Sequence, residues 1–270
     1  MGDTPAASSP APPPAFSEQE LAAIPAVLSA ARFGTYVREA DGDRARALRL
    51  YVWSTELSAA LGPPLHFAEV AVRNAVAEAV ESAYGTRDWH ESRTFAADLR
   101  DPMRGYSPRR DMLTACAEAE KQIRAAIVRE HQPATSKARR ERRRPPAAIG
   151  PVAVPVGKVV AELRFAFWVS LLTSAHQQRI WGNHLAVAFP HLPGAGGNPA
   201  DVARARQLLH EEVDGIRRFR NRVAHHEPLL RLRLEDELRR LVRVVGWRSP
   251  VTAAWLERSQ RVGRLLAQRP

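Results

Sequence analysis

The side chains most suited to chemistry lie close together near residue 220. Drawn as a helix with about 100° per residue, this part of the chain has one apolar stripe, and Arg220 falls in the middle of it. The stripe consists of Leu209, Val213, Ile216 and Val223. We therefore expect Arg220 to point inward. Because a buried guanidinium is destabilising without partners, it should lie against a carboxylate, a helix end or a cleft that receives an anion.

Asn221 and His225 form a second polar pair on the same segment. They are four residues apart, so their side chains share a helix face on which the amide can hydrogen-bond the imidazole. Pro228 indicates that the helix ends close by. A plainer interpretation also fits the spacing: Arg220 extends its charged head into water, and the histidines are ordinary surface residues.

Metal binding is the weaker interpretation of the two adjacent histidines, His225 and His226. Successive helical residues diverge by about 100°, and the sequence places no third ligand beside them. The single cysteine, Cys116, cannot form an intrachain disulfide and leaves no basis for a thiolate zinc site. We therefore expect no metal and no other cofactor, and the cysteine usage suits a cytoplasmic protein.

A second polar group, Glu69, Arg73 and Asn74, interrupts a strongly apolar segment. Glu69 and Arg73 have the spacing of an ion pair within one helix, which is worth about 0.2–0.5 kcal/mol. The alternative is a supporting role, in which Glu69 or Asn74 meets Arg220 or His225. The sequence leaves both interpretations open.

The overall charge favours an anionic partner. Forty Lys and Arg residues against 29 Asp and Glu residues give a formal charge of +11, a balance typical of proteins that bind nucleic acid. Much of the excess lies in a Pro-rich stretch at about 132–156, which we interpret as a mobile basic loop that holds RNA phosphates or is merely solvated. Its cations are Lys137, Arg139, Arg140, Arg142, Arg143 and Arg144.

The remaining elements that must position these residues are all predicted to be helices. Ser17 and Glu20 have capping-box spacing, Asn198-Pro199 is typical of a helix start, and Gly62-Pro63-Pro64 is expected to separate two helices. No convincing strand or repeat is found, so the predicted fold class is all-α. The predicted helices begin at 17 and cover about 43–61, 65–84, 108–131, 157–171, 178–189, 199–223 and 250–266, with one more after 228.

The ends of the chain and the longest apolar run complete this organisation. Residues 1–16 are rich in Pro, Ala and Ser and predict a disordered tail, followed by a single all-helical domain over 17–270. The longest apolar run, Phe165 to Ala175, is shorter than the roughly 20 residues that span a bilayer. We therefore expect no membrane association.

Three blocks of this sequence resemble a known family. Arg-Asn-x-x-x-His at Arg220 is similar to the R-x4-H signature of HEPN ribonucleases, and RNRVAHHEPL resembles the C-terminal motif of Abi-like (abortive infection) proteins. The segment Tyr51 to Val80 resembles that family's early Glu-x-x-x-Arg-Asn helix, and Gly157 to Leu172 resembles its central Phe-Trp helix. The blocks occur in family order and reach from about residue 50 to 230.

The resemblance implies an all-α, HEPN-like multi-helix bundle with additional helices, and a role for each motif residue. His225 would act as general acid or base, Arg220 would bind the scissile phosphate, and Asn221 would orient one of them. RNA supplies its own nucleophile, the 2'-hydroxyl, so the cleavage needs no metal and leaves a 2',3'-cyclic phosphate. HEPN nucleases commonly pair two motifs across a cleft, which implies a symmetric homodimer.

The sequence thus predicts a metal-independent endoribonuclease of the phage-defence or toxin type, with RNA as its partner and an antidote or regulatory protein as a further one. Two other classes stay open. The same site could bind RNA without cutting it. Alternatively, the chain could be a structural helical partner of a nucleotidyltransferase, which only the wider superfamily suggests.

Overall fold

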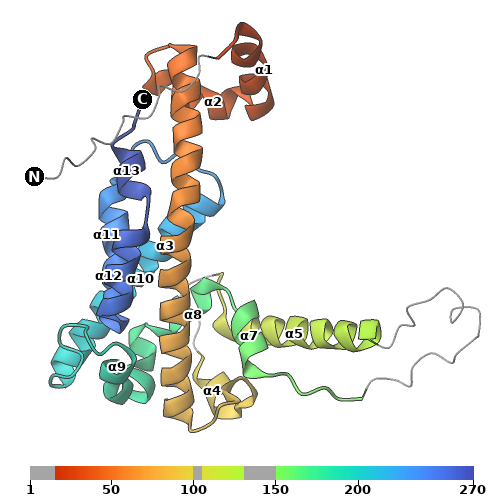
Figure 1. Ribbon diagram of the computed structural model, residues 1–270. Coiled ribbons are helices and arrows are strands. Elements are labelled where there is room, and N and C mark those ends of the chain that lie inside the picture. Colours follow the sequence, from red (N-terminus) through yellow and green to blue (C-terminus); the bar gives the residue numbers. More distant parts are fainter. Residues whose placement is uncertain (1–15, 100–104, 131–149) are drawn as a thin grey trace, which may run out of the picture. The chain divides into compact units, whose positions relative to one another are not determined.

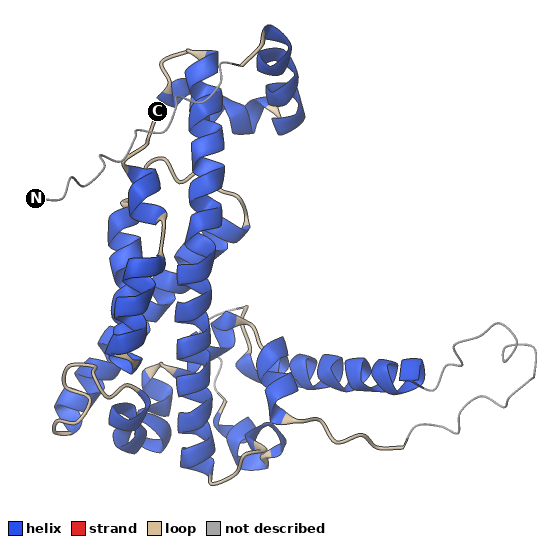
Figure 2. Ribbon diagram, in the orientation of Figure 1, coloured by secondary structure: helices blue, strands red, loops and turns tan. Residues whose placement is uncertain are grey.

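The structure is a computed structural model that describes residues 16–99, 105–130 and 150–270. Within these ranges every regular element is a helix and no strand is present (Figure 2). The predicted all-α class is therefore confirmed. The predicted tail and the cations from Lys137 to Arg144 lie outside the described residues.

The helices are labelled in Figure 1. Short turns, η1 (Trp89–Glu91), η2 (Ser174–His176) and the π-helical η3 (Gln177–Trp181), join some of them. The α-helices are α1 (Glu18–Leu28), α2 (Ala30–Glu39), α3 (Arg44–Tyr84), α4 (Arg93–Asp98), α5 (Pro108–Glu130), α7 (Val156–Glu162), α8 (Phe165–Leu171), α9 (Gly182–Ala188), α10 (Pro199–Ala224), α11 (Leu234–Arg248), α12 (Pro250–Ser259) and α13 (Val262–Leu266).

Both helix starts that side-chain chemistry predicted are confirmed. At α1 the Ser17 hydroxyl accepts a hydrogen bond from the Glu20 amide, and the Glu20 carboxylate accepts one from the Ser17 amide. At α10 the Asn198 side chain accepts hydrogen bonds from the amides of Ala200 and Asp201, both at 3.0 Å. These contacts satisfy amides that a helix start otherwise leaves without partners.

The predicted break at Gly62-Pro63-Pro64 is wrong, because α3 runs through both prolines as one helix of 41 residues. A proline inside a helix is destabilising by about 3 kcal/mol. The apolar face of the helix nevertheless continues past the two prolines, with Leu57, Leu61 and Leu65 all buried. Ending the helix there would expose that face, so burial outweighs the local preference of the prolines.

Two other predicted helices are each divided in the structure. The segment 157–171 forms α7 and α8, separated by extended backbone at Leu163 and Arg164. Here the Arg164 side chain reaches the buried carboxylate of Asp111, with 2.6 Å between Nε and Oδ1. The segment 250–266 forms α12 and α13, with extended backbone at Gln260. A short-range helical pattern does not reveal breaks of only two residues.

The chain divides into two compact units. The first comprises residues up to Ala60, Pro228–Leu232 and Arg261–Pro270, and the second comprises Leu61–Glu227 and Arg233–Gln260. Because α3 contributes residues to both, the single all-helical domain expected over 17–270 stays a prediction.

In the first unit, the C-terminal residues of the chain contact α2 and α3. The Trp53 indole donates a hydrogen bond to the Leu265 carbonyl at 2.6 Å. Arg269 lies over the Trp53 ring, pairs with Glu39 at 2.7 Å and donates to the Leu230 carbonyl. One arginine therefore ties three separate chain segments together.

The second unit is built around an aromatic cluster and around α10. Trp89 packs against Phe95, Phe167 and Trp168, with ring centroids 5.3–6.4 Å apart. Both Trp168 and Trp181 are fully buried and anchor this core. Helix α10 contacts α8, α9, η3 and α11, so its position is fixed along its length.

An arginine does point inward from the stripe of α10, but it is Arg206, which is only 7% exposed. Its Nε donates to the Gln177 side chain at 2.7 Å, and its Nη1 donates to the Leu172 carbonyl at 2.6 Å. Burial lowers the pKa of Arg206 from its ordinary value. Because Leu172 is the C-terminal cap of α8, the guanidinium satisfies a helix-end carbonyl and faces the negative end of the helix dipole.

Replacing Arg206 by alanine should destabilise the fold. The change leaves a cavity and removes the donors to Leu172 and Gln177, so we expect the free energy of unfolding to fall by about 2–4 kcal/mol. Denaturant unfolding followed by circular dichroism measures it. Arg204→Ala is the matched control, because Arg204 is exposed on the same helix, and should change stability by about 0.5 kcal/mol or less. Equal stability of the two variants would contradict the proposed anchoring.

Candidate functional site

The motif predicted near residue 220 occupies the C-terminal end of α10, which closes with a left-handed turn. The helix ends at Ala224, His225 is its C-cap, and His226 has a φ of 54°. The His226 amide donates to the Val223 carbonyl at 3.1 Å, and the Glu227 amide donates to the Arg222 carbonyl at 2.9 Å. This pair of hydrogen bonds defines a Schellman cap. In this motif the left-handed position, here His226, normally carries glycine.

A side-chain ion pair reinforces the same cap. Arg222 Nε lies 3.6 Å from Glu227 Oε2, across the two positions that usually make an apolar contact in a Schellman motif. Pro228 follows directly and cannot continue a helix hydrogen-bond ladder. The prediction that the helix ends near His225 is therefore confirmed.

Arg220 does not point inward as predicted. Its side chain is 45% exposed, and its Nε lies 3.5 Å from the Glu69 carboxylate on α3. It continues the line of Arg206, but it lies in the last turns of α10, past the buried Ile216 and Phe219. The expectation that its charge would face a carboxylate is met, while the guanidinium keeps access to solvent.

Glu69 pairs with Arg220 rather than with Arg73 on its own helix. Arg73 instead directs Nη1 to the Val160 carbonyl of α7 at 3.5 Å, and Asn74 is exposed. The plain ion pair within α3 is thus replaced by a contact between helices. Because both partners are partly in water, the ion pair itself contributes only about 0.2–1 kcal/mol, so its main effect is on where the guanidinium lies.

His225 and Asn221 share a backbone contact and no side-chain hydrogen bond. The His225 amide donates to the Asn221 carbonyl at 2.9 Å, as in any helical turn. Both residues belong to the described part of the chain, where no hydrogen bond joins the amide to the imidazole. The His225 side chain is exposed, so it is open to a ligand.

Comparison with known proteins places this motif in a family. A sequence model of Abi-like proteins matches residues 31–231, which include Glu69, Arg220 and His225. The chain belongs to the Abi-like protein family. Membership associates it with abortive infection, a form of phage defence. No curated protein and no solved structure matched the chain.

The described residues of this Abi-like protein hold no cluster of three or more His, Cys, Asp or Glu side chains with metal-binding geometry. Cys116 is half-buried, and burial raises the pKa of its thiol, with a smaller effect from the Glu91 carboxylate. None of the helices in the described ranges has the length and apolarity needed to cross a membrane.

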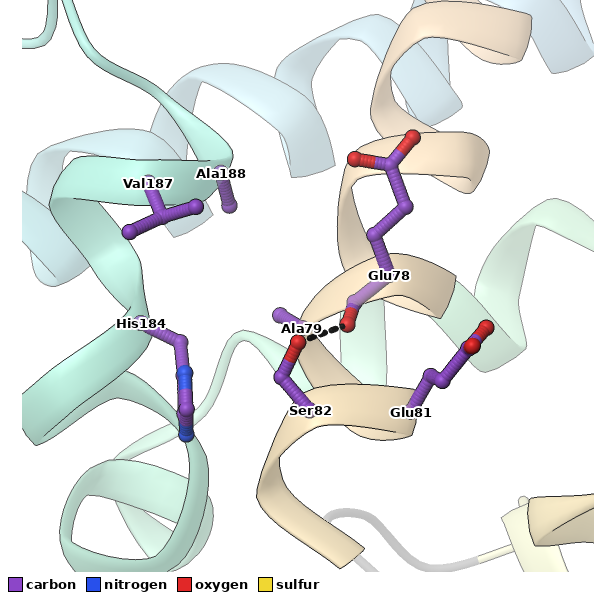
Figure 3. Close-up of a pocket in the computed structure, with 7 residues that line it drawn as sticks. All are labelled: Glu78, Ala79, Glu81, Ser82, His184, Val187 and Ala188. Carbon is purple, nitrogen blue, oxygen red and sulfur yellow. Dashed lines mark hydrogen bonds between the residues drawn. The ribbon is translucent and has the colours of Figure 1, made fainter. Parts of the chain in front are cut away.

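A separate cavity of about 300 Å³ lies between α3 and α9 (Figure 3). Two of its polar side chains already have partners. The Ser82 hydroxyl donates to the Glu78 carbonyl at 2.9 Å, and the Glu78 carboxylate pairs with Arg248. Arg248 also donates to the Ala188 carbonyl at the end of α9. This cavity contains none of the motif residues.

Two features of the Abi-like chain were missed by sequence reasoning. Arg206 occupies the same stripe as Arg220, so the same helical drawing could have identified it as the inward-facing cation. The left-handed conformation of His226 has a weaker signal, namely its place just after the last helical residue and two positions before Pro228.

His226→Gly should stabilise this cap. Glycine adopts positive φ without strain, so the free energy of unfolding should rise by about 0.5–1 kcal/mol. His226→Val, with a branched side chain at the same φ, should lower it. Thermal unfolding of the two variants measures the difference. If valine were as stable as glycine at this position, the left-handed conformation would be wrong.

Proposed function

We propose that this Abi-like protein is a metal-independent endoribonuclease of the phage-defence or toxin type, with a HEPN-like site. The supporting observation is the end of α10, where an imidazole and a guanidinium are both open to solvent and the guanidinium is held by Glu69. His225 is the general acid or base, Arg220 binds the scissile phosphate, and Asn221 orients one of them. We place the reaction in the cytoplasm.

The proposed chemistry uses the 2'-hydroxyl of the substrate. The 2'-oxygen forms a bond to phosphorus while the bond from phosphorus to the 5'-oxygen breaks. One proton leaves the 2'-hydroxyl for an imidazole, and one proton reaches the departing 5'-oxygen. Arg220 faces the negative charge that grows on the phosphate oxygens. The products are a 2',3'-cyclic phosphate and a free 5'-hydroxyl.

Glu69 is proposed to position Arg220, and Arg73 and Asn74 to border the same site. A carboxylate beside a phosphate-binding arginine limits the directions that the guanidinium can take. The contact is modest in energy, so its loss should weaken cleavage more than it weakens the fold. The basic residues Lys137, Arg139, Arg140, Arg142, Arg143 and Arg144 are proposed to hold the RNA backbone.

Cleavage of 5'-labelled RNA in EDTA tests the proposal. We expect His225→Ala and Arg220→Ala each to lower the rate by about 10²-fold or more, since each removes one catalytic contribution. Glu69→Gln should give an intermediate rate. Arg218→Ala is the matched control, because Arg218 is an exposed arginine on the same helix that pairs with Asp214. The proposal fails if His225→Ala and Arg220→Ala both cut as the wild type does.

A second copy of the chain completes the proposed site. On an ideal helix Arg220 and His225 diverge by about 140°, and α10 stays helical through Ala224. A single motif therefore directs its two side chains apart, whereas two facing motifs supply an imidazole on each side of one phosphate.

We accordingly expect a symmetric homodimer. Multi-angle light scattering should give about twice the 30.0 kDa of one chain. A monomeric protein that still cuts RNA would contradict this assembly.

A non-catalytic RNA-binding or regulatory role is the second candidate. It is favoured by the lack of a side-chain hydrogen bond between Asn221 and His225, which leaves the imidazole without a fixed orientation among the described residues. RNA that is bound by both wild type and His225→Ala, with no products from either, would establish this role. A restraining partner, such as an antidote protein, is proposed in either case.

A further inference from the structure

Helix α12 presents an exposed line of three side chains. Val251 is 81% exposed and Trp255 is 46% exposed, and Arg258 is also exposed. Their spacing of four and then three residues places them on one side of the helix. The opposite side is buried through Ala253 and Leu256. A large aromatic side chain is therefore left in water next to a cation.

Trp255 differs from every other tryptophan of the chain. All six lie in the described residues, and the other five are at most 7% exposed. Those five are Trp53, Trp89, Trp168, Trp181 and Trp247. Since tryptophan is highly buried on average, the exposure of Trp255 sets it apart from the other five.

Two residues of α3 extend the aromatic surface. The Phe67 ring lies 5.0 Å from the Trp255 ring, with 57° between their planes. The His66 ring meets Phe67 edge-on at 6.1 Å, and His66 is exposed. All of these residues belong to the second compact unit. Contact with Phe67 supports one side of the indole and fixes where Trp255 lies.

An arginine without an ion-pair partner in the described ranges lies beside this surface. Arg258 forms no ion pair with any described residue, whereas many other arginines of the second unit do. An unpaired cation at the edge of an aromatic surface suits a phosphate. The core of a protein interface, in contrast, is normally depleted of charge and rich in apolar area.

We propose that Trp255, supported by Phe67 and flanked by Arg258, is a stacking platform for a base of single-stranded RNA. Aromatic rings stack on every base, and an adjacent arginine holds the backbone phosphate. The choice of RNA as the ligand rests on the proposed function. The platform lies outside the catalytic motif, and α12 lies beyond residues 31–231 that match the family. It therefore gives this chain an additional contact with its substrate.

The fluorescence of the exposed Trp255 indole can report directly on RNA binding. Because the other five tryptophans are buried, acrylamide quenches mainly Trp255. The probe is an oligouridylate of about 20 nucleotides with 2'-O-methyl groups, which has no free 2'-hydroxyl and cannot be cut by the proposed chemistry. Adding it to the full chain should quench the emission and protect the remaining signal from acrylamide.

Substitutions at Trp255 separate stacking from apolar contact. Trp255→Leu should weaken binding of the oligonucleotide by about 5- to 150-fold, the range expected for one stacked base, while Trp255→Phe should retain most of the affinity. Arg258→Gln should reduce the dependence of log Kd on log salt concentration by about one unit. Val187→Ser, at an exposed apolar position of α9, is the control and should bind as the wild type does.

Two outcomes would overturn the platform. If Trp255→Leu bound the oligonucleotide as tightly as wild type, the platform would be wrong. If that variant also lost the mass of the dimer, this face would instead be a contact with a second copy of the chain. Absence of quenching in the wild type would also refute it. Cleavage is scored separately: a wild type that quenches but never cuts supports the platform and refutes the nuclease.

Discussion

The burial of one face of α10 is the constraint on which the second unit depends. That face carries apolar side chains and one cation, Arg206, whose two hydrogen bonds hold the end of α8 and the start of η3 against the helix. A buried guanidinium tolerates few geometries, because each donor needs an acceptor in its plane. The register of α10 is thereby fixed, and so is the position of its C-terminal residues.

The proposed site benefits from this fixed register without being buried itself. Arg220 lies on the continuation of the same face, beyond the last buried apolar side chains. There its guanidinium meets the carboxylate of Glu69. His225 follows at the cap, where the chain leaves the helix through the left-handed residue His226. A rigid helix therefore presents polar side chains at its end, which combines accuracy of position with access for a large ligand.

Local chemistry in the sequence predicted several features well. The capping residues Ser17 and Asn198 gave correct helix starts, and Pro228 correctly indicated the end of α10, because each acts through neighbouring backbone groups. Tertiary burial decided the rest. Pro63 should have stopped a helix, and Arg220 and Arg206 occupy equivalent places on one stripe, so only the packing of other helices distinguishes the buried cation from the exposed one. The motif and its family were readable from the residues, but the ion pair that joins α3 to α10 could be expected only as one of two alternatives.

The state of the chain's one thiol has a consequence for how motions of the protein can be followed. Cys116 lies half-buried on α5, and its surroundings disfavour the thiolate, which is the form that reacts with alkylating agents and oxidants. Modification at this atom is therefore slower while α5 stays packed than when that packing opens. The rate at which this one natural cysteine is modified thus reports on the packing of α5, with no need to engineer a label into the molecule.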